Sequence, residues 1–191
     1  MRVGVFGGTF DPVHNGHLSA GLSAIRQLNL DQIRLIPVCQ QPLKRSAPVT
    51  SANDRVAMLE LATEDQPAFV VDLREIDRGG LSYTADTIAE LRMEFLGDEL
   101  FLLLGSDAAK DFSRWRDTSE IERDVQLVIL TRPGSETMGP ILSGIYLEVP
   151  LVDVSSSMIR TTVRRGGVID EMVPASVASY IHDRGLYQSD I

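Results

Sequence analysis

Short apolar runs alternate with longer amphipathic segments along this chain, and this alternation constrains the fold more than any other feature. The apolar runs cover residues 3–6, 33–38, 69–71, 100–104 and 125–130. They are continuous rather than interrupted by polar residues, which is typical of strands buried on both faces of a sheet. Helical patterns lie between them, for example at residues 16–28, 54–63 and 84–95. The alternation predicts an α/β fold with an open, mostly parallel sheet that binds ligands at the carboxyl ends of its strands.

The C-terminal third of the chain favours helices. Three serines at residues 155–157 offer side chains that can cap a helix N-terminus, and the glycines at residues 166–167 can end that helix. Pro174 fits the first turn of a last helix that runs to about residue 183. The 191 residues suit one domain. We therefore expect a single domain with a helical segment from about residue 155.

Charge and cysteine content exclude several classes of function. The formal net charge is -9 at pH 7, whereas nucleic acids and anionic membranes call for a basic face. An anionic substrate therefore needs positive charge that is concentrated locally. Cys39 is the only cysteine, so an internal disulfide is impossible and a reducing compartment is favoured. The chain shows no signal peptide and no run near the roughly 20 apolar residues that span a bilayer, so we expect a cytoplasmic protein.

The stretch GGTFDPVHNGH, residues 7–17, holds two of the three histidines and directly follows the first predicted strand. It opens with two glycines, which lack a Cβ and let a ligand approach the backbone closely. A helix is expected to begin near Gly16, and its free N–H groups favour an anion. His14 and His17 share a face if the helix starts there. The stretch therefore predicts a phosphate site with two imidazoles.

Other nucleotide and metal signatures do not occur. The dinucleotide fingerprint G-x-G-x-x-G is missing, because the glycines stand at positions 4, 7 and 8, and Cys39-Gln40-Gln41 replaces the expected acidic residue. The phosphate loop G-x-x-x-x-G-K-[ST] is missing as well. A zinc pair would need two more ligands, which no cysteine or acidic-histidine cluster supplies. A remaining alternative is that the two histidines only cap or pack a loop.

GGTFDPVHNGH resembles the H-x-G-H signature of the nucleotidyltransferase superfamily. That superfamily includes nicotinate mononucleotide adenylyltransferases, phosphopantetheine adenylyltransferases and glycerol-phosphate cytidylyltransferases. The chain most resembles the first of these, and the phosphopantetheine branch usually has threonine where His14 stands. The resemblance implies a Rossmann-like fold in which His17 meets the transferred phosphoryl group and His14 binds phosphate. It also implies that four residues of the turn bind ATP, namely Gly7, Gly8, Thr9 and Phe10.

SSSMIR, residues 155–160, resembles the second superfamily signature, I-S-S-T-x-I-R, with Val154 and Ser157 in place of the usual Ile and Thr. The segment predicts a second helix N-terminus with exposed hydroxyls. Arg160 lies one turn into that helix, where its guanidinium can fork onto phosphate oxygens. The resemblance implies that Ser156 and Ser157 bind ATP and that Arg160 holds its β and γ phosphates. Without the first motif, a capped helix with a solvated arginine would be the preferred interpretation.

GGLSYTADTI, residues 79–88, resembles S-Y-T-x-D-T, an element that points to the nicotinate mononucleotide branch. By that resemblance, Thr84 and its neighbouring backbone meet the pyridine carboxylate. The alternative is that Ser82 or Thr84 caps a helix, with Asp86 in the first turn, where the helix dipole favours a carboxylate.

LLLGSDAAKDFSRW, residues 102–115, resembles the family's strand followed by G-x-D and a tryptophan. Gly105 and Asp107 would bind ATP at the carboxyl end of this strand, with Asp107 accepting from ribose hydroxyls. Trp115 would stack on the nicotinate ring of the mononucleotide, whose flat face it matches. The alternative is that this single tryptophan belongs to the core.

Four weaker matches extend the resemblance along the chain. Lys44, in an expected surface loop, stands where the family often has His-Lys, although position 43 is Leu, and it is expected to bind ATP. Arg132 in LTRPG is expected to bind phosphate of the mononucleotide. Arg55 in NDRVAML matches an Arg-x-x-Met-Leu helix or is a surface ion-pair residue. The tail VPASVASYIHDRGLY resembles the family's last helix, for which we expect a packing role.

The reaction implied by the resemblance is attack of the mononucleotide's phosphate on the α-phosphorus of ATP, which releases pyrophosphate and forms deamido-NAD. The nucleophile is already an anion, so catalysis reduces to positioning and to neutralising charge. A local cationic cluster is expected to hold both substrates, with Mg²⁺ carried by ATP. Its expected members are His14, His17, Lys44 and Arg160. The alternatives are a sister transferase acting on nicotinamide mononucleotide or phosphopantetheine, and a nucleotide-binding module without turnover.

Overall fold

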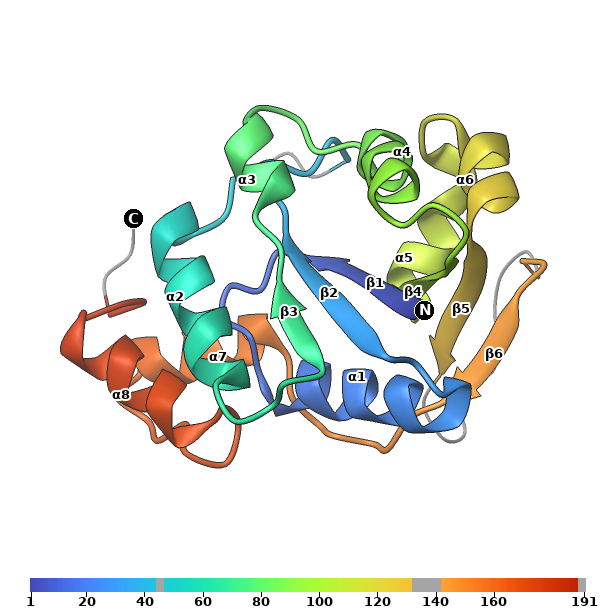
Figure 1. Cartoon of the computed structure of the whole chain (residues 1–191). Helices are drawn as coiled ribbons and strands as arrows, with labels where there is room; N and C mark the ends of the chain where they lie inside the picture. Colours follow the sequence, from blue (N-terminus) through green and yellow to red (C-terminus); the bar gives the residue numbers. More distant parts are fainter. Residues whose placement is uncertain (44–46, 132–141, 189–191) are drawn as a thin grey trace.

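The computed structural model describes residues 1–43, 47–131 and 142–188, and a single twisted sheet organises them (Figure 1). The strand order is β3-β2-β1-β4-β5-β6, and all the strand pairs are parallel. This confirms the prediction of an open parallel α/β sheet. The strands are β1 (Arg2–Gly8), β2 (Gln32–Pro37), β3 (Phe69–Val71), β4 (Glu99–Gly105), β5 (Gln126–Thr131) and β6 (Ile145–Glu148).

Helices follow the strands in sequence and cover the sheet on both faces, as predicted (Figure 1). They are α1 (Asn15–Leu28), α2 (Ala52–Thr63), α3 (Arg74–Arg78), α4 (Thr84–Glu94), α5 (Ser106–Asp111), α6 (Thr118–Asp124), α7 (Ser156–Arg164) and α8 (Ala175–Asp183), with a short 3-10 helix η1 (Phe112–Arg114) after α5. Within the described part of the chain, no helix is long and apolar enough to cross a membrane.

The core consists of two apolar clusters, one on each face of the sheet. Residues of α1, α2, α7 and α8 build the first cluster, and residues of α4, η1 and α6 build the second. Strand β4 shows how one strand serves both, because Phe101 and Leu103 belong to the first cluster and Leu100, Leu102 and Leu104 to the second. Successive side chains of a strand point to opposite faces. The two-sided burial therefore explains why the strand sequences are continuous apolar runs.

Strand β6 was not predicted, and its burial explains why. It lies at the edge of the sheet, and of its four residues only Leu147 is buried. Its sequence therefore lacks the continuous apolar run that marks the other strands.

Helix α7 begins and ends as its sequence predicts. The Ser155 hydroxyl accepts from the Met158 N–H at 3.2 Å and caps the helix start. Gly166 adopts a left-handed φ of 71°, and the Gly167 N–H donates to the Thr162 carbonyl at 2.9 Å, a Schellman-type end. Pro174 directly precedes α8 rather than lying in its first turn.

The order of the strands places a topological switch point at the carboxyl ends of β1 and β4. The chain moves outward from β1 to β2 and β3, and then returns to β4 on the other side of β1. The connections after β1 and β4 therefore diverge to opposite faces, and ligands of such sheets bind where this happens. Gly7 and Gly8, which were predicted to follow the first strand, are the last two residues of β1, and Gly105 ends β4, so all three lie at the carboxyl ends of these strands.

Candidate active site

The glycine turn, which is formed by residues 7–10 at the end of β1, is shaped by a buried aromatic ring. A Cβ added to Gly8 would lie 2.9 Å from the ring of Phe10, so glycine is required at this position. Phe10 has a left-handed φ of 48° and is only 1% exposed, so its ring supports the turn from the core. Gly7 is exposed and Thr9 is half-buried. A ligand at this turn would therefore meet the backbone of Phe10 and not its ring.

The two histidines meet at the start of α1. His14 is the N-cap residue and His17 the third residue of the helix. Their rings stack, with centroids 3.7 Å apart and planes inclined by 26°, which confirms that they share a face. The ring of Phe10 meets His17 edge-on at 5.0 Å between centroids. The pair is thus fixed by ring contacts directly beside the glycine turn.

The surroundings of His17 favour its neutral form. The backbone N–H of His14 donates to Nδ1 of His17 at 3.3 Å. Burial, followed by the neighbouring His14 ring, lowers the pKa of His17 well below its ordinary value of 6.5. A neutral imidazole that accepts at Nδ1 is assigned its proton on Nε2. The free protein therefore favours a neutral His17, which differs from the expected cation, because the ring is largely buried and lies against a second imidazole.

The N-terminus of α7 docks onto the loop between the glycine turn and the histidines. The Ser156 hydroxyl donates to the Pro12 carbonyl at 2.8 Å, and Nη1 of Arg160 donates to the Asp11 carbonyl at 2.7 Å. Ser157 is exposed on the next position. The structure therefore brings the two predicted signatures together, although 144 residues separate Ser156 from Pro12.

Strand β4 pairs with β1, and α5 begins directly after its last residue. Gly105 is exposed and is the N-cap of that helix. Asp107 stands in the first turn with its side chain fully exposed, 3.6 Å from the Lys110 ammonium. The Ser106 hydroxyl, which the motif comparison did not single out, donates to the Leu130 carbonyl at 3.2 Å and ties this turn to β5. Gly105 and Asp107 thus lie at the carboxyl end of β4, as predicted.

The segment predicted to recognise the mononucleotide leads into α4. Thr84 is the first residue of the helix, and the N-cap is Tyr83, whose side chain makes no capping bond. The Ser82 hydroxyl accepts from the Cys39 N–H at 3.0 Å instead of capping α4. The interpretation that Ser82 or Thr84 caps the helix is therefore wrong, because Ser82 fastens this segment to the end of β2.

Trp115 lies close to the same segment. Its neighbour Arg116 places its guanidinium 4.0 Å from the ring centroid of Tyr83 and forms an ion pair with Asp86. Trp115 itself is half-buried and packs obliquely on Phe112, with ring centroids 5.4 Å apart. The structure therefore brings together the two elements that the sequence predicts to hold the mononucleotide.

Two residues predicted to bind substrate, Lys44 and Arg132, lie outside the described residues.

Two charged residues have a role that the sequence did not predict. Arg55 is 1% exposed and its Nη1 donates to the Thr9 carbonyl at 2.8 Å, which excludes the interpretation as a surface ion-pair residue. Burial also lowers its pKa. Asp11, to which the sequence assigned no role of its own, is 2% exposed. Its place in the first motif was the only signal in the sequence.

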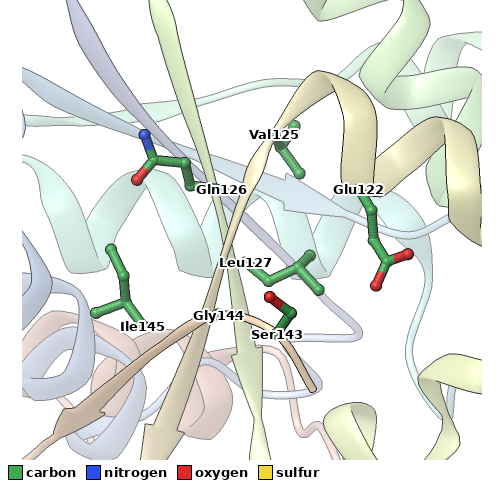
Figure 2. Close-up of a pocket in the computed structure, with 7 residues that line it drawn as sticks. All are labelled: Glu122, Val125, Gln126, Leu127, Ser143, Gly144 and Ile145. Atoms are coloured by element: carbon green, nitrogen blue, oxygen red, sulfur yellow. The ribbon is translucent and has the colours of Figure 1, made fainter.

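A pocket of about 430 Å³ lies elsewhere, at the amino ends of β5 and β6 (Figure 2). Its lining comes from the end of α6 and from the first residues of these two strands. Glu122 is its only ionisable side chain, and it contains none of the residues predicted for the site. The pocket therefore lies at the amino ends of the strands, whereas the histidine pair lies at their carboxyl ends.

Comparison with known proteins agrees with this arrangement. The model of the cytidylyltransferase-like family matches residues 5–162. A probable nicotinate-nucleotide adenylyltransferase from Gemmatimonas aurantiaca is 43% identical, over 98% of this chain and 93% of that protein. The nicotinate-nucleotide adenylyltransferase of Bacillus subtilis is 37% identical, over 98% of this chain and 99% of that protein.

Among solved structures, the Plasmodium falciparum nicotinic acid mononucleotide adenylyltransferase complexed with NaAD has the same fold, with a TM-score of 0.77 at 18% identity over 99% of this chain and 98% of that one. The sequence matches extend over nearly the whole chain and include both signatures that the fold brings together. The chain belongs to the cytidylyltransferase-like family and, within it, to the nicotinate-nucleotide adenylyltransferases.

Proposed function

We propose that this protein transfers the adenylyl group of MgATP to the phosphate of nicotinate mononucleotide in NAD biosynthesis. A phosphate oxygen of the mononucleotide forms a bond to the α-phosphorus, and the bond from that phosphorus to the oxygen bridging to the β-phosphorus breaks. The products are pyrophosphate and deamido-NAD. The observation that carries the proposal is the stacked His14–His17 pair beside the glycine turn at the switch point of the sheet. The relatives' names and their extent of similarity support it.

His17 acts in this proposal as a neutral hydrogen-bond donor. Its Nε2–H would point at an oxygen of the α-phosphate, where negative charge grows as the nucleophile arrives. The bond from the His14 N–H to Nδ1 fixes the ring orientation before the substrate binds. A preorganised donor of this kind stabilises the transition state without reorganisation. His14 binds phosphate beside it.

Arg160 and the N-termini of α1 and α7 hold the β and γ phosphates. One nitrogen of the Arg160 guanidinium is bonded to the Asp11 carbonyl, which orients the group and leaves its other nitrogens for phosphate oxygens. Helix starts add partial positive charge. Lys44 is proposed to contribute to the same phosphates and Arg132 to the mononucleotide. This local arrangement lets a chain of net charge -9 bind two anions.

The start of α4 is proposed to recognise the nicotinate carboxylate. No side chain caps this helix, so its first N–H groups suit a carboxylate better than a neutral amide. Trp115 would stack on the pyridine ring. Asp86 also stands in the first turn, but its charge is offset by the ion pair with Arg116. This arrangement supports the acid rather than the amide form of the mononucleotide.

Magnesium enters as part of the substrate MgATP. Within residues 1–43, 47–131 and 142–188, no group of three or more His, Cys, Asp or Glu side chains is placed to hold a metal ion. The triphosphate oxygens are therefore proposed as its ligands, and Gly105 and Asp107 as contacts of the adenosine half. We also retain the proposal of a cytoplasmic enzyme, which the single cysteine supports.

An acceptor panel tests the proposal. Pyrophosphate release is measured with ATP or CTP and with nicotinate mononucleotide, nicotinamide mononucleotide or phosphopantetheine. We expect the highest kcat/KM for ATP with nicotinate mononucleotide. A preference for another acceptor would identify a sister transferase. ATP binding without pyrophosphate release from any pair would identify a nucleotide-binding module instead.

A further inference from the structure

The carboxylate of Asp11 accepts hydrogen bonds from segments that are far apart in the sequence. Asp11 is 2% exposed. One carboxylate oxygen accepts from the Val49 N–H at 2.6 Å and the Thr50 N–H at 3.3 Å, and the other accepts from the Thr50 hydroxyl at 2.7 Å. These bonds fasten the loop that precedes α2 to the loop that carries the histidines.

A further bond comes from the C-terminal region. The hydroxyl of Tyr187 donates to the same Asp11 oxygen as Thr50, at 2.7 Å, across 176 residues of sequence. Tyr187 is 6% exposed, and burial raises its pKa, with the Asp11 charge acting in the same direction, so the phenol keeps its proton. It also holds a left-handed φ of 64°, which a residue with a side chain adopts only where its surroundings impose it.

The backbone of Asp11 contacts residues that are proposed to bind phosphate. Its carbonyl accepts from Arg160, and the next carbonyl, that of Pro12, accepts from Ser156. His14 follows two residues later. Arg55, which is buried, also holds this loop, because its guanidinium donates to the Thr9 carbonyl. Moving the Asp11 carboxylate would therefore displace Arg160 and His14 together.

We propose that Asp11 is a positioning residue and that Tyr187, by holding its carboxylate, sets the placement of Arg160 and His14 for ATP. The C-terminal segment thus contributes to the nucleotide site and not to packing alone. The proposal rests on the proposed function for its link to catalysis, but its effect on ATP affinity can be measured without any acceptor. Displacing a binding group by about 1 Å is enough to change rates by up to roughly 100-fold.

The test compares two conservative variants on the same C-terminal segment. Tyr187→Phe removes only the hydroxyl that meets Asp11. Tyr180→Phe is the matched control, because its hydroxyl also donates to a carboxylate at 3.0 Å, that of Asp54 on α2, and not to Asp11. For both variants and the unmodified protein, titration calorimetry gives the Kd for ATP and for nicotinate mononucleotide separately. Thermal unfolding gives the Tm, and pyrophosphate release gives kcat.

We expect Tyr187→Phe to weaken ATP binding about tenfold, with the Kd for the mononucleotide within about twofold of normal. Tyr180→Phe should lower the Tm without changing either Kd. Equal ATP affinities in the two variants, or equal losses for both substrates in Tyr187→Phe, would overturn the proposal. If Tyr187→Phe does not fold, Thr50→Val removes another donor from the same oxygen and should weaken ATP binding in the same selective way.

The outcomes separate this inference from the proposed function. An unmodified protein that binds ATP but releases no pyrophosphate with any acceptor contradicts the proposed function, and the ATP affinities of the variants still decide the role of Tyr187. An unmodified protein that does not bind ATP contradicts both.

Discussion

At the scale of single residues, the proposed chemistry depends on how the protein sets the protonation state of one imidazole. His17 is enclosed by Phe6, Phe10 and His14, and a backbone N–H occupies its Nδ1. These contacts favour the neutral ring with its proton on Nε2. In the proposed reaction the histidine motif therefore supplies an oriented hydrogen-bond donor, and guanidinium and ammonium groups supply the permanent positive charge.

Replacement of His17 by alanine tests this role. His17→Ala should fold normally and lose turnover by a factor of about 100 or more, because one preorganised donor to the growing charge is removed. Steady-state pyrophosphate release measures the loss, and circular dichroism checks the fold. His182→Ala is the control, since that ring is exposed on α8. Near-normal turnover in His17→Ala would refute its role.

Replacement of Trp115 separates the two halves of the site. Trp115→Ala should raise the KM for nicotinate mononucleotide about tenfold, since stacking of a ring on an aromatic side chain contributes roughly 1–3 kcal/mol. The KM for ATP should stay within about twofold. Initial rates with each substrate varied in turn provide both constants. An effect confined to ATP would contradict the stacking role.

Sequence reasoning was accurate for residues whose partners are local. The three-residue spacing of His14 and His17 predicted a shared face, which the stacked rings confirm. It was incomplete for buried charges, because the choice of partner depends on tertiary packing. Asp11 contacts residues 38 and 176 positions away, and no local pattern contains that information. For the same reason Arg55 could not be assigned to the interior from its own sequence context.

At the scale of elements, short helices carry the links between the strands and the site. Helix α3 places Glu75, 5% exposed, against α4, where its carboxylate accepts from the Thr87 hydroxyl at 2.7 Å. Arg78 donates in turn to the Thr87 hydroxyl at 2.9 Å. These bonds fix α4, whose start is proposed to meet the nicotinate carboxylate. The long helices were predicted within a few residues, whereas a helix as short as α3 shows too few turns for a periodic pattern.

Glu75 gives the contact between α3 and α4 a dependence on pH. Desolvation raises its pKa above the ordinary value of 4.5. A carboxyl with a raised folded pKa contributes stability that is full below the unfolded pKa and is lost as pH rises through the folded pKa. Glu75→Gln keeps an acceptor for Thr87 but cannot ionise. The variant should therefore gain stability relative to the unmodified protein as pH rises from about 5 to 8.

Urea unfolding of both proteins at each pH measures this difference. Glu60→Gln, on the exposed surface of α2, serves as the control for loss of a carboxylate. A difference in unfolding free energy that stays constant between the two pH values would show that Glu75 titrates alike in the folded and unfolded chain.

At the scale of the whole molecule, the strand order explains why so many distant segments converge. The connections after β1 and β4 leave the sheet on opposite faces, and α7, from the C-terminal third of the chain, contacts the loop that follows β1. The sequence predicted the parallel sheet from its apolar runs and the site from its motifs. It did not predict strand order, since the runs alone do not specify which strands are neighbours. The single-domain organisation stays a prediction.

Binding of ATP should stabilise the whole fold. At a concentration of about 100 times its Kd, a ligand of the native state adds about 2.7 kcal/mol to the free energy of unfolding. For a chain of this size we expect the Tm to rise by roughly 5–10 °C. Thermal unfolding with and without MgATP checks this. Arg160→Ala should lose most of the rise, whereas Arg123→Ala, an exposed residue of α6, should keep it. An unchanged rise in Arg160→Ala would remove Arg160 from the nucleotide site.

The bond between Tyr187 and Asp11 has a consequence for synthesis of the protein. A nascent chain emerges from the ribosome with its histidine motif first, and the residue that holds Asp11 in place is translated 176 positions later. Until then the loop that carries the histidines lacks one of the hydrogen bonds that hold Asp11. With the proposed role of Tyr187, competence to bind nucleotide should therefore arise late in translation, and unfinished chains should bind ATP weakly.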